Sequence, residues 1–105
     1  MIGKFEELVL LACIRAGDKA LPSAIYQRLL AGQKTAAFGA LYTTLGRMAD
    51  KKLVAEVAIT DGKSRERRAF TITGEGQKAL RDALEASRAI GGIAEIGGIG
   101  ACPAL

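Results

Sequence analysis

The sequence contains no histidine and no tryptophan, and its 105 residues include only two cysteines, Cys13 and Cys102. Without histidine there can be no Ser-His-Asp triad and no zinc site with imidazole ligands, and two cysteines are too few for a four-cysteine cage. No glycine-rich phosphate loop is recognisable either. We therefore expect no metal, no cofactor and no enzymatic activity. Because one disulfide would not explain a chain that is 50% hydrophobic, the cysteines favour a reducing compartment, with Cys13 as a core residue.

Long apolar runs are also missing. The first run, residues 8–14, follows Glu6 and Glu7, whereas a secretory signal places positive charge ahead of its apolar stretch. A membrane-spanning helix needs roughly 20 apolar residues. We expect a cytoplasmic protein without a membrane partner.

Positive charge exceeds negative charge only mildly. Fifteen lysines and arginines against 11 acidic residues give a net charge of +4. Much of this excess falls in residues 63–68, where Lys63, Arg65, Arg67 and Arg68 accompany a single glutamate. Such a concentration favours a polyanionic partner.

The first predicted helix covers residues 4–16 and is apolar on two sides. Positions 5, 8, 9, 12 and 16 have the spacing of one helical face, and Gly17 follows as a stop. A second side is formed by Leu10, Leu11 and Ile14. In so small a protein, we expect this second side to contact a partner subunit.

Two further helices are expected before residue 52. One covers residues 23–31 with Gly32 as its stop, and the other runs from residue 36 to about residue 51 with Thr35 as its N-cap. The apolar stripe of the later helix consists of Phe38, Leu41, Leu45 and Met48. Its opposite face carries small, hydroxylated or basic residues, namely Ala36, Ala37, Ala40, Thr43, Thr44 and Arg47. Nothing on that face is typical of a protein core.

The period then changes to that of a β-hairpin. Residues 53–59 are rich in β-branched side chains, residues 60–63 contain the Asp-Gly turn signal, and residues 67–72 form the returning strand. Residues 73–76 open a last helix, whose expected buried stripe is Leu80, Ala83, Leu84, Ser87 and Ile90. The predicted fold is mainly α with a small β-hairpin (α+β).

This order of elements is that of a winged helix-turn-helix. The second and third helices are joined by a short turn containing Gly32, and in a helix-turn-helix the later helix lies in the DNA major groove. The cationic hairpin is the expected wing. We predict double-stranded DNA as the partner, contacted by Lys34, Thr35, Ala36, Ala40, Tyr42, Thr43, Thr44, Arg47, Lys63, Arg65 and Arg67. Each of these residues taken alone is also compatible with an ordinary solvated surface or, for Tyr42, with a ring packed in the core.

Two segments resemble one known family. Residues 35–54, TAAFGALYTTLGRMADKKLV, resemble the recognition-helix segment of the PadR family of transcriptional regulators, with its Gly-x-Leu-Tyr run followed by a leucine and an arginine. Residues 62–76, GKSRERRAFTITGEG, are similar to the wing of that family and to the Thr-x-x-Gly opening of its last helix. The resemblance implies a DNA-binding regulator and, in some members, a small hydrophobic effector at the dimer interface.

We divide the chain into a winged helix-turn-helix domain at residues 1–76, a dimerisation helix at 77–90 and a glycine-rich tail at 91–105. The tail is compatible with a segment without fixed structure and with one that becomes ordered on a second subunit. The residues expected at the homodimer interface are Phe5, Leu10, Leu11, Ile14, Leu80, Leu84, Ser87 and Ile90.

The predicted function is that of a homodimeric, sequence-specific repressor that binds a pseudo-palindromic operator and is released by a small hydrophobic effector. The alternative is a winged-helix module that binds another protein and not DNA, since the apolar side of the first helix would also suit a different partner.

Overall fold

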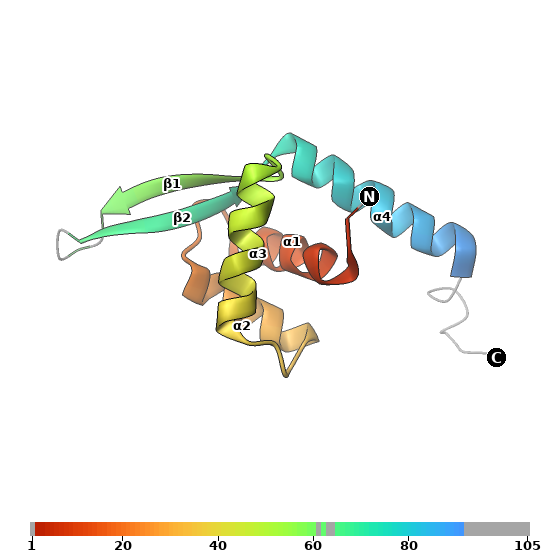
Figure 1. The fold of residues 1–105 in the computed structure, drawn as a ribbon, viewed down its shortest axis with the longest axis horizontal. Helices are drawn as coiled ribbons and strands as arrows, with labels where there is room; N and C mark the ends of the chain where they lie inside the picture. Colours follow the sequence, from red (N-terminus) through yellow and green to blue (C-terminus); the bar gives the residue numbers. More distant parts are fainter. Residues whose placement is uncertain (1, 61, 63–64, 92–105) are drawn as a thin grey trace.

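The computed structural model describes residues 2–60, 62 and 65–91 (Figure 1). Its elements, in chain order, are α1 (Lys4–Ala16), α2 (Pro22–Gly32), α3 (Phe38–Asp50), β1 (Val54–Thr60), β2 (Glu66–Ile72) and α4 (Gly74–Gly91). The predicted winged helix-turn-helix order is confirmed. The predicted dimerisation helix, 77–90, lies within α4, and the tail beyond residue 91 falls outside the described residues.

Helix α1 forms the centre of the core. It contacts α2, α3, α4 and β2, and it ends at Gly17, whose φ of 94° lies in the region that favours glycine. Because so many elements cover α1, Leu10 is fully buried beside Val9 and Cys13. The expectation that Leu10 lies on an outer side was therefore wrong.

The turn between α2 and α3 is closed by two hydrogen bonds of the Ala36 main chain. The Ala36 N–H donates to the Gln33 carbonyl at 3.1 Å, and the Ala36 carbonyl accepts a 2.8 Å hydrogen bond from the Tyr26 hydroxyl. Helix α3 therefore starts at Phe38, after Ala37, and has no side-chain cap. The prediction that Thr35 caps this helix was wrong, and Ala36 is a half-buried turn residue, not part of the helical face.

The hairpin is anchored to the helices at its base. Strands β1 and β2 pair antiparallel, with Val54 opposite Ile72 and Thr60 opposite Glu66. At the base, Ala20 and Phe70 exchange two main-chain hydrogen bonds of 3.0 and 2.8 Å. The outer half extends away from the helices, on the side of the molecule opposite α4 (Figure 1).

The start of α4 is packed closely against the chain leading into β1. The Thr73 hydroxyl accepts a hydrogen bond from the Gly76 N–H at 3.0 Å and donates to the Lys52 carbonyl at 2.7 Å. A Cβ atom on Gly76 would overlap the Leu53 carbonyl oxygen, so no other residue fits there without a backbone shift. These contacts are the physical basis of the Thr-x-x-Gly pattern at the start of this helix.

Candidate nucleic-acid interface

Helix α3 buries one side and exposes the other. Leu41, Leu45 and Met48 are fully buried in the core. The exposed side carries Gly39, Ala40, Tyr42, Thr43, Gly46 and Arg47. A Cβ atom added at Gly39 or Gly46 would meet nothing within 4 Å, so the helix backbone at these two positions is not covered by other parts of the described chain. A face of this kind allows a close approach of another molecule.

Two predicted positions on α3 are corrected by the structure. Thr44 is only 6% exposed, because it lies three residues after Leu41 and four before Met48 and so belongs to the buried stripe. Phe38, which was expected in the core, is 43% exposed. Phe38 is the first residue of the helix, and its ring contacts Tyr26 of α2.

Three aromatic rings lie together at the start of α3. The Tyr26 ring meets the Phe38 ring edge-on, with centroids 5.3 Å apart at 88°. Phe38 in turn stacks on Tyr42, with centroids 6.3 Å apart at 17°. From the sequence, Phe38 was expected in the core and Tyr26 was not expected at the site. Tyr26 and Phe38 lie on different helices, so their contact depends on how the turn between α2 and α3 places these helices. The spacing of residues in the sequence does not show this.

The arginines of the wing adjoin the aromatic rings. Arg67 and Arg68 of β2 line a shallow hollow of about 330 Å³ together with Pro22, Phe38 and Tyr42. The Arg68 guanidinium also forms a 3.1 Å ion pair with Glu56 of β1. The exposed side of α3 and the wing thus share one surface. Arg65 is exposed nearby in the chain, whereas Lys63 falls outside the described residues.

Positive groups also flank α3 at both ends. Lys34 and Thr35 are exposed in the turn before the helix. At the other end, Arg47 and Lys51 lie near Glu6 of α1, and the Lys51 ammonium donates to the Glu6 carboxylate at 3.1 Å. The pKa of Glu6 lies below its ordinary value, mainly because the carboxylate accepts the Gly3 N–H and also because of Lys51 and Arg47.

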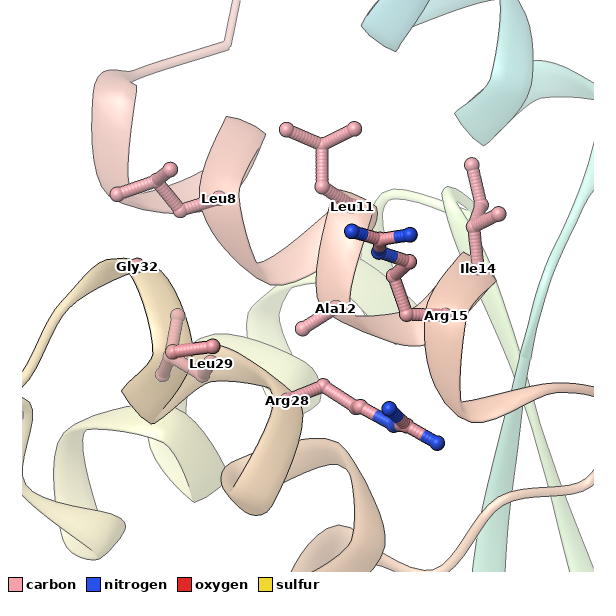
Figure 2. Close-up of a pocket in the computed structure, with 9 residues that line it drawn as sticks. Leu8, Leu11, Ala12, Ile14, Arg15, Arg28, Leu29 and Gly32 are labelled. Atoms are coloured by element: carbon pink, nitrogen blue, oxygen red, sulfur yellow. The ribbon is translucent and has the colours of Figure 1, made fainter.

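A second surface is formed by α1 and α2. The hollow between these helices has a volume of about 640 Å³, and its lining includes Leu8, Leu11, Ile14, Arg15 and Arg28. Figure 2 shows Leu11 and Ile14 projecting from the same side of α1. Ile14 is 47% exposed, which leaves part of this apolar side without a partner within the described chain.

The other candidate interface residues divide into two groups. Leu80, like Leu10, is buried in the chain's own core, so neither side chain is accessible to a second subunit. Phe5 and Leu11 are half-buried, and Leu84, Ser87 and Ile90 are exposed on α4. Ile90 is 89% exposed. The second half of α4 therefore presents apolar side chains that the core of this chain does not cover.

Groups that carry out chemistry are scarce in the described residues. Within residues 2–60, 62 and 65–91, no three His, Cys, Asp or Glu side chains lie close enough to hold a metal ion. Burial raises the pKa of the Cys13 thiol to about 12, so it stays protonated at neutral pH and acts as a core residue. In the same part of the chain, no helix has the length and apolarity that crossing a membrane requires.

The fold and the surface shared by α3 and the hairpin define a winged helix-turn-helix protein. The model of the "Transcriptional regulator PadR-like family" matches residues 23–82. This match covers more than half of the sequence, and the chain belongs to that family, whose members are transcription regulators and not enzymes. The resemblance stated from residues 35–54 and 62–76 is thereby confirmed.

Solved structures share the fold at low sequence identity. A PadR family regulator from Clostridium difficile R20291 is 20% identical, with a TM-score of 0.71 over 84% of this chain and 91% of that one. A PadR-like regulator from Bacillus cereus is 18% identical, with a TM-score of 0.71 over 91% and 92%. The Aeropyrum pernix Orc1 protein, solved in complex with DNA, is 17% identical, with a TM-score of 0.65 over 81% of this chain and 24% of that one. Among curated protein sequences, none matches this chain.

Proposed function

We propose that this transcription regulator is a cytoplasmic, homodimeric repressor that binds a pseudo-palindromic operator in double-stranded DNA. The observation that carries the proposal is the continuous surface made by the exposed side of α3 and the arginines of the wing. The second helix of a helix-turn-helix lies in the major groove, and its small side chains allow a close approach to the bases. A cationic hairpin beside it contacts phosphates. The Aeropyrum pernix Orc1 protein, which shares this fold over 24% of its chain, was solved in complex with DNA, and this agrees with DNA as the partner.

The exposed residues divide by their chemistry into two kinds of contact. Thr43 and Arg47 have hydrogen-bonding groups that suit base edges, and Ala40 and Tyr42 flank them on the same helix. Phosphate contacts would come from Lys34, Thr35, Arg65 and Arg67, and from Lys63 beyond the described residues. Thr44 has no part in this interface because it is buried.

The proposed dimer joins the two apolar surfaces that one copy leaves uncovered. In a two-fold arrangement, α4 of each copy, with Leu84 and Ile90, packs on the α1–α2 hollow of the other. Leu11 and Ile14 would line the receiving side, Phe5 precedes them on the same helix, and Ser87 lies on the inserted helix. Glu85 of α4 is exposed, and its charge is opposite to that of Arg15 and Arg28 at the hollow. Release by a small hydrophobic effector at this interface stays a prediction from the resemblance.

The experiment that tests the DNA function is selection of bound duplexes from a random pool. We expect the selected sites to contain two inverted half-sites about one helical turn, roughly 34 Å, apart. Fluorescence anisotropy at several salt concentrations should show affinity falling steeply, because each neutralised phosphate releases counterions. A selection that yields no common sequence would contradict the proposal. Binding of a different protein at the α1 side with no DNA binding would favour the protein-interaction alternative.

A further inference from the structure

The exposed side of α3 has few groups that can read bases by hydrogen bonds. Between Phe38 and Asp50 the sequence has no asparagine, glutamine or lysine. The exposed polar groups on this helix are Tyr42, Thr43, Arg47 and Asp50. Bidentate recognition of adenine depends on asparagine or glutamine, so this helix has no side chain for that contact, and an A·T pair in its site would have to be recognised in another way.

The start of the helix offers an apolar surface instead. Phe38 and Tyr42 are each 43% exposed, although aromatic rings of this size are usually well buried. Their positions are fixed, because Phe38 is held edge-on by Tyr26 and the Tyr26 hydroxyl is bonded to the Ala36 carbonyl at 2.8 Å. A rigid, exposed pair loses little conformational freedom when it binds a partner.

The charges around these rings indicate what covers them. Arg67 and Arg68 line the same hollow as Phe38 and Tyr42, and the acidic Glu66 lines it too, so the lining carries two positive charges and one negative charge. The first turn of α2, which begins at Pro22 on the rim, contains no acidic residue. Apolar rings bordered by guanidinium groups suit the edge of a DNA groove, where phosphates flank the bases.

Only one base presents an apolar group in the major groove. The thymine C5 methyl is the sole such group there, and the N-terminal residues of a recognition helix contact the base edges. Phe38 is the first residue of α3, and Tyr42 lies one turn later on the same side. We propose that Phe38 and Tyr42 contact thymine methyl groups and so specify thymine in each operator half-site. This inference rests on the proposed DNA-binding function.

The test uses the full chain and the operator obtained by selection. Each thymine of a half-site is replaced in turn by deoxyuridine, which removes the methyl group and keeps every hydrogen-bonding group of the base. We expect affinity in fluorescence anisotropy to fall by about fourfold for each contacted methyl, the factor that corresponds to one buried methyl-sized group. Unchanged affinity at every position would overturn the inference and leave the proposed function standing, whereas absence of specific binding to the thymine operator would overturn the proposed function.

Protein variants assign the methyl contact to the two rings. Phe38→Ala and Tyr42→Ala should bring the ratio of thymine to deoxyuridine affinities close to one at the position each ring contacts. Tyr42→Phe, which keeps the ring and removes the hydroxyl, should retain the ratio. Circular dichroism verifies that the variants fold, and the deoxyuridine scan on the unmodified protein decides the question independently of them. A ratio that persists in both folded alanine variants would overturn the assignment.

Discussion

The Lys51 ammonium donates a 3.1 Å hydrogen bond to the Glu6 carboxylate, which ties the end of α3 to the first turn of α1. Glu6 also accepts the Gly3 N–H at 3.0 Å and so helps to cap α1. One carboxylate therefore connects the start of the central core helix with the helix proposed to enter DNA. Because Glu6 lies among these donors, its charge affects both stability and the electrostatics of the interface.

Removing the charge of Glu6 should make the free energy of unfolding less dependent on pH in the acidic range. The pKa of Glu6 is lowered from its ordinary value of 4.5, so its stabilising contribution is complete above about pH 5 and is lost as pH falls through the lower folded-state pKa. Glu6→Gln should lower the free energy of unfolding at neutral pH by about 0.5 kcal/mol, the scale of a partly exposed ion pair. Thermal melts between about pH 3 and 7 check this. A variant that loses as much stability in acid as the parent would contradict it.

The Thr73 hydroxyl should contribute measurably to stability. It accepts the Gly76 N–H and donates to the Lys52 carbonyl, so Thr73→Ala removes a helix cap and a link to the chain before β1. We expect a loss of about 1–2 kcal/mol in urea unfolding. Thr73→Ser keeps the oxygen and is the matched control, with an expected loss of less than about half as much. Equal losses in the two variants would show that the hydroxyl is not responsible.

Two glycines should respond to alanine in opposite directions. At Gly76 the new Cβ would overlap the Leu53 carbonyl oxygen, and we expect Gly76→Ala to cost about 2–3 kcal/mol or to prevent folding. At Gly46 nothing lies within 4 Å, and Gly46→Ala should stabilise α3 by about 0.5–1 kcal/mol. The free energies of unfolding of the two variants are measured in denaturant, and each variant is the control for the other because both carry the same change of glycine to alanine. A stable Gly76→Ala protein would mean that the start of α4 is more loosely packed.

The sequence predicted the helices and strands better than it predicted which of their residues are buried and which are exposed. Helical spacing located residues 4–16 and the Leu41, Leu45 and Met48 stripe correctly, because both patterns are local. Spacing alone does not define how wide the buried arc is, and that width depends on which elements pack against the helix. Leu10 was misplaced for this reason, since four other elements surround α1.

The same distinction applies to the candidate site. Thr44 has the polar character of a surface residue, but its position between two buried leucines and a methionine places it inside. Thr35 has a strong intrinsic tendency to cap helices, which the main-chain turn at Ala36 overrides. The aromatic group at Phe38 depends on contacts between two helices, and a single helical wheel cannot show it.

Removing one wing arginine should weaken DNA binding in a way that depends on salt. Arg67 lines the hollow beside α3 and is proposed to contact a phosphate, so Arg67→Ala should reduce the slope of log affinity against log salt by about 0.9. Arg81, which is exposed on α4 on the far side of the molecule from the hairpin, supplies the matched control. Arg81→Ala should leave the slope unchanged. Equal slopes for the Arg67 variant and the parent, measured by anisotropy, would exclude this phosphate contact.

A charge on the outer side of α1 should separate the proposed dimer. Ile14 is 47% exposed at the hollow that is proposed to receive α4 of a second copy, and a glutamate there would bury an unpaired charge in the interface. Light scattering of Ile14→Glu should give the mass of one 11.0 kDa chain, and the parent twice that mass. Gln27→Glu adds the same charge at an exposed position of α2 outside this hollow and should leave the dimer intact.

Because a monomer engages one half-site at a time, Ile14→Glu should also lose affinity for the full operator by about a hundredfold while retaining its affinity for a single half-site. An Ile14→Glu protein that keeps the mass of two chains would place the dimer contact elsewhere on the molecule.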